Sequence, residues 1–261
     1  MRLQVQVKQL FQKLLRGIRT MKIDDYYVNS SQPVFHKYTE GEVFNPQDIL
    51  KAALETNKAI RQLVISFKSE SNMQLFDVID KKQTGAFVGA IFIKKIVETA
   101  PYLVKNPSQT GHPDLVPSRY LDPSKKWDQQ YWDQFPHGGV EVKTSCGNLK
   151  NGMTHTLTID NPRIEHLTGI VWKGHHNEIN NLLGLFWDYC EGYPKIFAAF
   201  FSNALEPTDF TYTVPKEGGG HTTNVCITKS SASKKLGQGW VFCIKEAKYS
   251  KFISRMFGIR F

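Results

Sequence analysis

Residues 111–117 have the sequence GHPDLVP, and residues 138–145 have the sequence GGVEVKTS. Apolar and polar residues alternate in the second stretch, which predicts a β-strand with its two valines on one face and Glu141 and Lys143 on the other. In the first stretch a short apolar run follows Asp114 and predicts a second, shorter strand. Helical patterns precede these two strands and strand patterns follow them, so they mark the change from one kind of structure to the other.

The first part of the chain has the periodicity of helices. Apolar residues at helical spacing, with basic residues between them, predict an amphipathic helix near the N-terminus. A longer helix is predicted to open at Asn45-Pro46. Another is predicted from about Thr84 to Thr99, where Gly85 and Gly89 allow close packing against a neighbour and Pro101 ends the helix.

The later part of the chain has the pattern of a β-sheet, because short apolar or alternating runs recur between turn residues. Strands are predicted at residues 115–116, 139–145, 154–159, 182–189, 196–201, 224–228 and 239–244. The run Ile196–Phe201 is apolar throughout, which predicts a central strand. The last two strands flank SSASKKLGQ and predict a hairpin with a basic tip. Together the patterns predict an α/β fold with a mixed central β-sheet flanked by helices and a helical N-terminal part.

The composition excludes several classes of protein. With 261 residues, 41% hydrophobic and 12% aromatic, the chain can fill a large core and is not expected to be disordered. Its four cysteines form no CxxC motif, which argues against a disulfide scaffold or a structural zinc site. No apolar run approaches the roughly 20 residues of a membrane span, so we expect a soluble protein without a membrane partner.

The charge is unevenly distributed. The net charge of +9 comes from 33 basic and 24 acidic residues; residues 1–23 carry +6 and residues 228–261 carry +7, which leaves 9 − 13 = −4 for the middle. This distribution favours a protein whose basic ends bind an anionic polymer on the outside, while its acid-bearing middle carries out metal chemistry inside. The alternative is a soluble basic protein with solvated charged faces.

The two stretches quoted above supply the residue types of a metal-dependent catalytic site. If their strands pair, Asp114 and Glu141 converge on one divalent cation, and the backbone carbonyl of Val142 offers a further oxygen ligand. Mg²⁺ prefers such oxygen ligands together with waters. Lys143 would then orient or deprotonate the attacking water, or stabilise charge on a phosphate. The alternative is that Glu141 and Lys143 form a solvated pair and that Pro113 and Asp114 form a turn.

This arrangement, a Pro-Asp pair followed after 26 residues by Glu-x-Lys, resembles the PD-(D/E)XK nuclease family. The chain as a whole is similar to a prokaryotic Type II restriction endonuclease, and the resemblance covers roughly residues 84–245. It implies a restriction-endonuclease-like core and a Type II site-specific deoxyribonuclease that cleaves double-stranded DNA with Mg²⁺. It also implies a homodimer in the prokaryotic cytoplasm, and a further acid supplied by the preceding helix, for which Glu98 is the candidate.

Two alternatives to a restriction enzyme remain open: a repair or recombination nuclease of the same superfamily, and a non-catalytic DNA-binding module. No nucleotide cofactor is expected, because the Gly218–Gly220 run lacks the lysine and serine of a P-loop. In this interpretation residues 1–83 form an N-terminal helical region that contacts DNA or dimerises. Residues 84–261 form the catalytic core, ending in the basic hairpin, and both parts can belong to one domain.

Several side chains are candidates for contact with DNA, because lysine reaches phosphates and histidine and asparagine reach base edges. These candidates are Lys173, His175, His176, Asn177, Lys234 and Lys235. A polar turn and a solvated hairpin tip are the alternative interpretations. The aromatic residues Trp127, Tyr131 and Trp132 lie between the two catalytic stretches, where they either stack on nucleic acid or pack inside an insertion.

Overall fold

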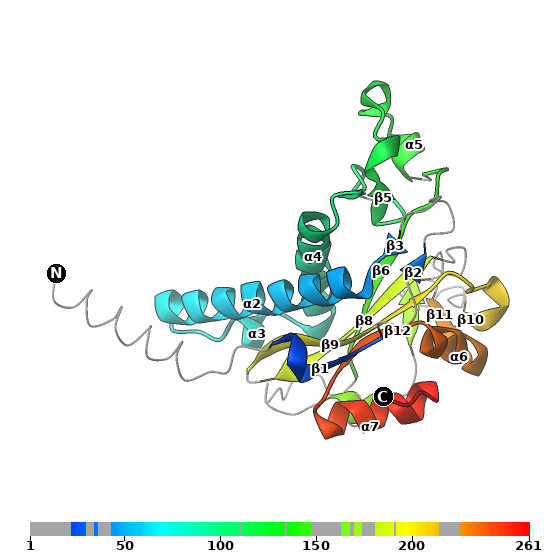
Figure 1. The fold of residues 1–261 in the computed structure, drawn as a ribbon. Coiled ribbons are helices and arrows are strands. Elements are labelled where there is room, and N and C mark those ends of the chain that lie inside the picture. The colour runs from blue at the N-terminus through cyan, green and yellow to red at the C-terminus, as the bar shows by residue number, and fades with distance from the viewer. Residues whose placement is uncertain are drawn as a thin grey trace, which may run out of the picture.

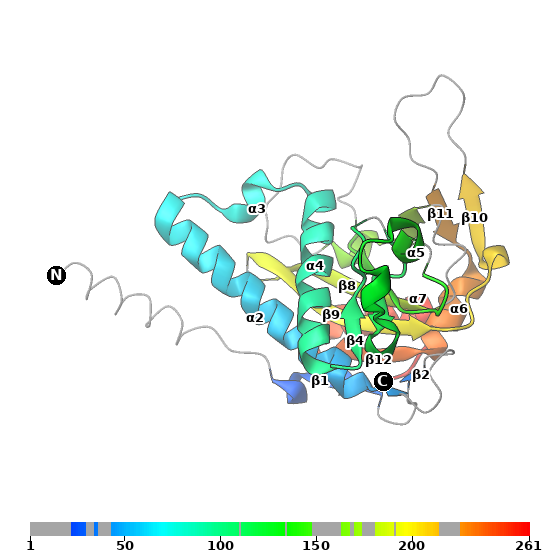
Figure 2. The same ribbon diagram turned by 90° about the horizontal axis from the view of Figure 1, so that it is seen from above.

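The fold is that of a computed structural model, drawn in Figures 1 and 2. The structure describes residues 22–29, 34–35, 43–109, 111–133, 135–147, 163–167, 170–173, 181–190, 192–213 and 225–261. The amphipathic helix predicted near the N-terminus and the strand predicted at 154–159 lie outside these ranges. Among the helices of the described ranges, none has the length and apolar character needed to cross a membrane.

The described part of the N-terminal half contains two long helices. Helix α2 (Pro46–Ser71) begins where predicted, because the Asn45 side chain accepts a hydrogen bond of 2.9 Å from the Gln47 N–H and proline occupies the first turn. Helix α4 (Lys81–Thr99) begins three residues earlier than predicted, since Asp80 caps it through the Gln83 N–H at 2.8 Å. A short helix, α3 (Leu75–Val78), connects the two.

A five-stranded mixed sheet forms the centre of the molecule. Its strands lie in the order β1 (Tyr26–Val28), β12 (Trp240–Ile244), β9 (Tyr193–Ser202), β8 (Leu182–Cys190) and β6 (Glu141–Ser145). Strand β6 runs parallel to β8, and the other neighbours are antiparallel. The apolar run at 196–201 is in the central strand β9, as predicted. The coarse prediction of a mixed α/β fold is therefore confirmed.

Helices cover the sheet on both sides. Helices α2 and α4 pack on one side, and α6 (Ser230–Gln238) and α7 (Ala247–Phe257) pack on the other (Figure 1). Buried side chains of α2, such as Ile49 and Leu50, share one hydrophobic cluster with the strands of the sheet. The described part of the N-terminal region thus packs directly on the sheet.

The remaining elements are short. They are the strands β2 (Val34–Phe35), β3 (Val43–Phe44), β4 (Leu103–Lys105), β5 (Leu115–Pro117), β7 (Val171–Lys173), β10 (Phe210–Thr213) and β11 (Val225–Thr228), the helix α5 (Gln129–Asp133), and 3₁₀ helices at Ile23–Asp25, Ser118–Tyr120, Pro123–Lys125, Ile164–His166 and Pro207–Asp209. Strands β4 and β5 pair with each other, and β11 lies between β10 and β7.

The prediction of a C-terminal hairpin is wrong. The SSASKKLGQ segment forms helix α6, and the strands on either side of it join different sheets, β11 with β10 and β7, and β12 with β9 and β1. The segment is helical because Ala232 and Leu236, four residues apart, are both buried on one face. Two apolar residues in a polar segment are too weak a periodic signal to be recognised from the sequence.

Helix α4 holds the strand that carries the predicted catalytic residues. A Cβ atom added at Gly85 would lie 3.1 Å from the Thr144 Oγ1 atom, and one added at Gly89 would lie 3.3 Å from the Thr144 Cγ2 atom. The Thr144 hydroxyl donates a hydrogen bond of 3.0 Å to the Gly85 carbonyl. The two glycines therefore allow the close packing predicted for them, and they fix the position of β6 against the helix.

Candidate active site

The structure brings Asp114 and Glu141 together at the edge of the sheet. Asp114 directly precedes β5 and Glu141 is the first residue of β6. Leu115 and Val140, the residues next to them, form an antiparallel bridge with N···O distances of 3.1 Å and 2.8 Å. A single antiparallel bridge therefore joins β5 to the residue that precedes β6, and it brings the two stretches together as the sequence analysis expected.

Each of the two carboxylates accepts a hydrogen bond from the backbone of the other strand. The Asp114 N–H donates to the Glu141 Oε2 atom at 3.2 Å, and the Val142 N–H donates to the Asp114 Oδ2 atom at 2.9 Å. This reciprocal arrangement fixes both side chains in one place. The carboxylates lie together because of backbone geometry, and not because of an accidental rotamer.

Lys143 completes the predicted set of residues. Its ammonium forms an ion pair with the Glu141 Oε1 atom, as two-residue spacing on a strand allows. The Glu141 side chain is 3% exposed and that of Lys143 is 20% exposed. A solvated surface pair is thus excluded for Glu141, because its carboxylate lies inside the protein.

The pKa of Asp114 is raised, because its carboxylate is largely removed from solvent and lies beside that of Glu141. Loss of solvent is the largest cause and repulsion by Glu141 is the second, and together they raise the pKa of Asp114 to about 6. Lys143 and the Val142 N–H lower this pKa. Lys105, at the end of β4, also lowers this pKa. Lys105 was not identified from the sequence, because its proximity to Asp114 depends on the pairing of β4 with β5.

We expect a pH dependence of stability from Asp114 in protein free of divalent cations. Since its folded pKa of about 6 lies above the unfolded value of 3.8, the folded state binds the proton more tightly, and stability is lost as pH rises from about 4 to about 6. The loss attributable to this group is on the order of 3 kcal/mol. Urea denaturation with EDTA, comparing wild type with Asp114→Asn across this range, isolates the effect. Parallel stability curves for the two proteins would contradict it.

A buried amide holds the loop that carries Asp114. The Asn106 side chain is 3% exposed; its Nδ2 atom donates to the Pro113 carbonyl at 3.1 Å and to the Trp132 carbonyl at 2.9 Å. The Asn106 N–H donates to the Asp114 carbonyl at 2.9 Å. Asn106 is therefore a positioning residue, which connects the Asp114 loop to the insertion between β5 and β6.

Replacing Asn106 by alanine leaves buried carbonyl groups without donors, and we expect a loss of about 2–4 kcal/mol in the free energy of unfolding. Asn57 offers a matched control, because it is also buried and exchanges hydrogen bonds of 3.0 Å and 2.8 Å with Ile196 in the core. Both alanine variants should lose stability in urea denaturation. Only Asn106→Ala should also weaken stabilisation by Mg²⁺ or Ca²⁺; equal weakening in both would show that Asn106 has no local role.

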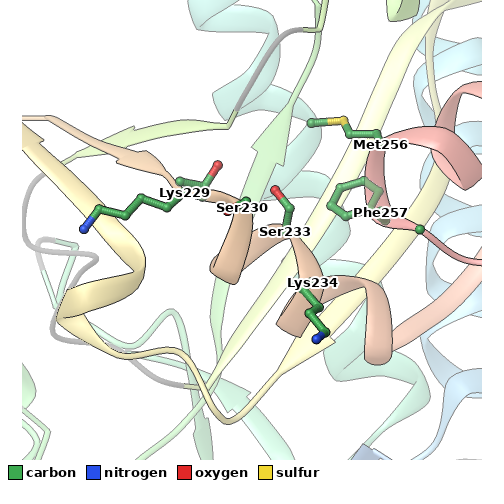
Figure 3. A pocket seen from close by; sticks show the side chains of 8 residues that line it. Lys229, Ser230, Ser233, Lys234, Met256 and Phe257 are labelled. Atoms are coloured by element: carbon green, nitrogen blue, oxygen red, sulfur yellow. The ribbon is translucent and has the colours of Figure 1, made fainter.

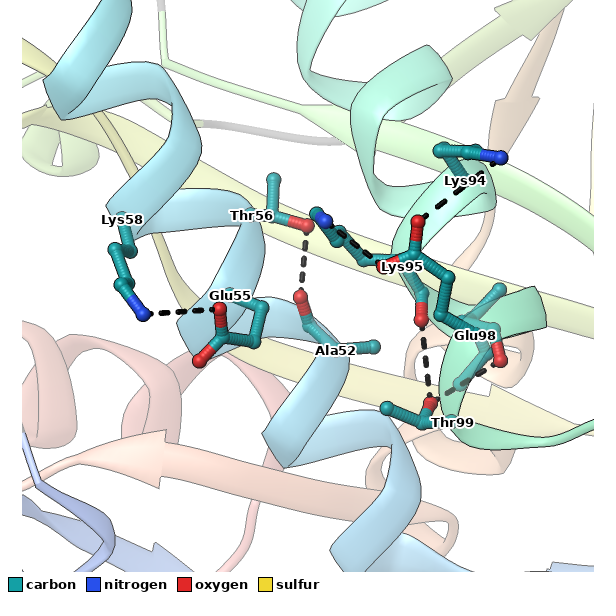
Figure 4. Close-up of polar contacts among 9 residues, drawn as sticks. Ala52, Glu55, Thr56, Lys58, Lys94, Lys95, Glu98 and Thr99 are labelled. Carbon is teal, nitrogen blue, oxygen red and sulfur yellow. Dashed lines mark hydrogen bonds and ion pairs between the residues drawn. The ribbon is translucent and has the colours of Figure 1, made fainter.

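Glu98 does not join this site. Its carboxylate forms ion pairs with Lys95 at 2.8 Å and Lys94 at 4.0 Å on its own helix (Figure 4). The hydrogen bond from Lys95 is the main cause that lowers its pKa. Among the described residues there is no group of three or more His, Cys, Asp or Glu side chains that could hold a metal ion. The acidic side chains of the candidate site are therefore the pair Asp114 and Glu141.

The predicted DNA-contacting residues have different environments. Lys173 ends β7, and residues 175–177 lie outside the described ranges. Lys235 is in α6, where its ammonium pairs with Asp209 at 2.7 Å and with Glu206 at 3.4 Å. Lys234 is exposed and lines a pocket of about 570 Å³ between α6 and α7, where it and Lys229 extend in different directions (Figure 3). The sequence had suggested that Lys234 and Lys235 lie at the tip of a hairpin, but both are in helix α6.

The donor set at the paired strands fits Mg²⁺. It consists of two carboxylates and the backbone carbonyl of Val142. The Val142 N–H points to Asp114, while the Glu141 N–H points to the Asn181 carbonyl beside β8. The N–H and C=O of one strand residue face the same side, so the Val142 carbonyl faces Asp114 as well. Oxygen ligands alone are typical of Mg²⁺ and Ca²⁺.

Comparison of the chain with models of protein families, with curated proteins and with solved structures gives no match. Inference about its function therefore depends on the geometry and chemistry of the site formed by Asp114, Glu141 and Lys143.

Proposed function

We propose that the chain is a Mg²⁺-dependent endonuclease that hydrolyses phosphodiester bonds in double-stranded DNA at specific sites, in the manner of a Type II restriction enzyme. The observation that carries the proposal is the convergence of Asp114, just before β5, and Glu141, at the start of β6, beside the ammonium of Lys143. The resemblance of these residues to the PD-(D/E)XK pattern supports the same reaction.

The three side chains have distinct roles in this reaction. Asp114 and Glu141, with the Val142 carbonyl, would hold Mg²⁺, which when bound supplies positive charge that acidifies water and offsets charge on the phosphate. Lys143 orients the attacking water or stabilises the charge that develops on the phosphate. The oxygen at the 3′ side of the phosphorus leaves in line, and the family resemblance implies a 5′-phosphate and a 3′-hydroxyl as products.

A non-catalytic DNA-binding module accounts less well for the same residues. A carboxylate beside a phosphate repels it unless a cation lies between them, so a surface that only binds DNA has no use for an acidic pair. In contrast, a hydrolase needs both the acidic pair and nearby positive charge. Lys105 and Lys143 provide that charge from two different strands.

A homodimer belongs to the same proposal. A duplex site with two-fold symmetry is matched most simply by two identical subunits related by the same symmetry. We further propose that the enzyme acts in the cytoplasm of a prokaryotic cell, where it would cleave foreign DNA. Size-exclusion chromatography with light scattering, with and without a cleavable duplex, tests the oligomeric state.

The test of the activity uses the purified full chain with plasmid, phage and genomic DNA, in Mg²⁺ or in EDTA. We expect discrete fragments in Mg²⁺ and none in EDTA, and sequencing of the fragment ends gives the site and position of cleavage. Asp114→Asn protein purified in parallel controls for contaminating nucleases. Absence of cleavage in all three DNAs, together with no thermal stabilisation by Mg²⁺ or Ca²⁺, would contradict the proposal.

A further inference from the structure

The insertion between β5 and β6 presents one aromatic side chain to solvent. Trp127 is 87% exposed, more than any other large hydrophobic side chain in the described ranges. Trp132, five residues later, is 2% exposed and stacks on Phe135 with a ring-centroid distance of 5.4 Å. The sequence alone does not separate packing from nucleic-acid binding for these tryptophans. The structure assigns Trp132 to packing and leaves Trp127 free to bind.

The turn that carries Trp127 is held firmly on both sides. The Trp132 indole N–H donates a hydrogen bond of 2.7 Å to the Lys125 carbonyl, and the Trp132 backbone N–H donates to the Asp128 carbonyl at 3.2 Å. The Lys125 ammonium pairs with the Asp128 carboxylate at 3.1 Å. An exposed indole on a restrained turn loses little conformational entropy on binding, which favours its use as a contact residue.

The same hydrogen bonds connect this turn to the catalytic loop. Trp132 accepts a hydrogen bond from Asn106, whose own N–H donates to the Asp114 carbonyl. The His112 N–H makes a second connection, of 3.3 Å, to the Asp133 carbonyl. In Figure 1 helix α5 rises from β5 at the end of the molecule where β6 begins. A polymer bound at Asp114 and Glu141 would therefore pass close to the insertion.

Positive charge accompanies the exposed ring. The Lys126 ammonium lies over one face of the Trp127 ring, 5.1 Å from the ring centroid, so a base would stack on the opposite face. Nearby carboxylates are already engaged: Asp128 pairs with Lys125, and Asp122 accepts a hydrogen bond from the Ser124 N–H at 2.8 Å. Within the part of the chain that the structure describes, no carboxylate pairs with Lys126. An exposed aromatic ring with an ammonium that no carboxylate neutralises is a combination that binds a base and its phosphate.

We infer that Trp127 stacks on an unpaired base of the DNA substrate and that Lys126 contacts the adjacent phosphate. This inference rests on the proposed nuclease function and deepens it, because stacking on a side chain requires a base that has left the duplex. The substrate would then contain a single-stranded segment or an opened base pair near the cleaved bond.

The test measures equilibrium binding by fluorescence anisotropy in Ca²⁺, with a single strand, a fully paired duplex, and the same duplex with one unpaired base. Trp127→Ala should lose about 5- to 150-fold in affinity for the first and third DNAs and little for the second. Trp127→Phe, which keeps an aromatic face, should fall between wild type and Trp127→Ala. Leu121→Ala is the matched control, since Leu121 is a 44% exposed apolar residue of the same insertion.

The outcomes separate the inference from the proposed function. If wild type binds and cleaves DNA but Trp127→Ala binds all three DNAs equally well, the inference is wrong and the nuclease proposal stands. An equal loss on the fully paired duplex, or a Trp127→Phe variant no better than Trp127→Ala, would also overturn stacking on an unpaired base. If wild type neither binds nor cleaves any DNA, both proposals fail.

Discussion

Replacing Asp114 by asparagine or Glu141 by glutamine is expected to reduce DNA cleavage by at least about 10³-fold, which corresponds to the several kcal/mol that a bound divalent cation contributes to such a reaction. Both substitutions keep the size of the side chain and remove its negative charge. The amide oxygen of each variant can still accept its backbone hydrogen bond from Val142 or Asp114. The variants should therefore fold, and the loss should come from weakened binding of Mg²⁺.

A binding measurement accompanies the kinetic one. Mg²⁺ or Ca²⁺ at about 100 times its Kd stabilises a protein by about 2.7 kcal/mol, because the ion binds the folded state alone. Wild type should show this stabilisation in thermal unfolding, and both acid variants should show little of it. Glu55→Gln, at a surface carboxylate that pairs with Lys58 at 3.4 Å on α2, is the control and should match wild type. Full stabilisation of either acid variant by Mg²⁺ would show that the pair does not hold the ion.

The elements with strong periodicity could be predicted from the sequence. Helix α2 has a buried stripe and a Pro at its start, and the apolar strands β8 and β9 are buried along their whole length. In each case many residues repeat the same signal, so a single exception does not hide it. Helix α6 shows the opposite case, with only two buried apolar side chains, Ala232 and Leu236, in a polar segment.

The candidate site could be predicted in part, because its geometry is mostly local. The spacing of Glu141 and Lys143 places both on one face of any strand, and Asp114 lies one residue before its own strand. Lys105 and Asn106 were missed, since their roles depend on the pairing of β4 with β5 and on contacts with the distant Trp132. Such contacts between segments leave no periodic pattern in the sequence.

Lys143→Ala provides the second large effect, and it separates a catalytic site from one that only binds a cation. Removing the ammonium leaves the acidic pair without its ion-pair partner, so the site becomes more negative and should keep or increase its affinity for Mg²⁺. The cleavage rate should nevertheless fall by about 10²–10³-fold, the range expected when one preorganised electrostatic or acid–base group is lost. The rate should thus fall while the affinity for Mg²⁺ does not.

Lys143→Arg tests the same role with the charge retained. The guanidinium is planar, wider than an ammonium and unable to act as a base, so it should restore the neutralisation of Glu141 without restoring the rate. The measurement is single-turnover cleavage of a duplex bound in Ca²⁺ and started with Mg²⁺, with Lys58→Ala as the control at a surface ion pair. A Lys143→Ala enzyme that cleaves as fast as wild type once the duplex is bound would mean that Lys143 only balances the charge of a buried acid. In that case the match to the Glu-x-Lys pattern would be a coincidence of strand alternation.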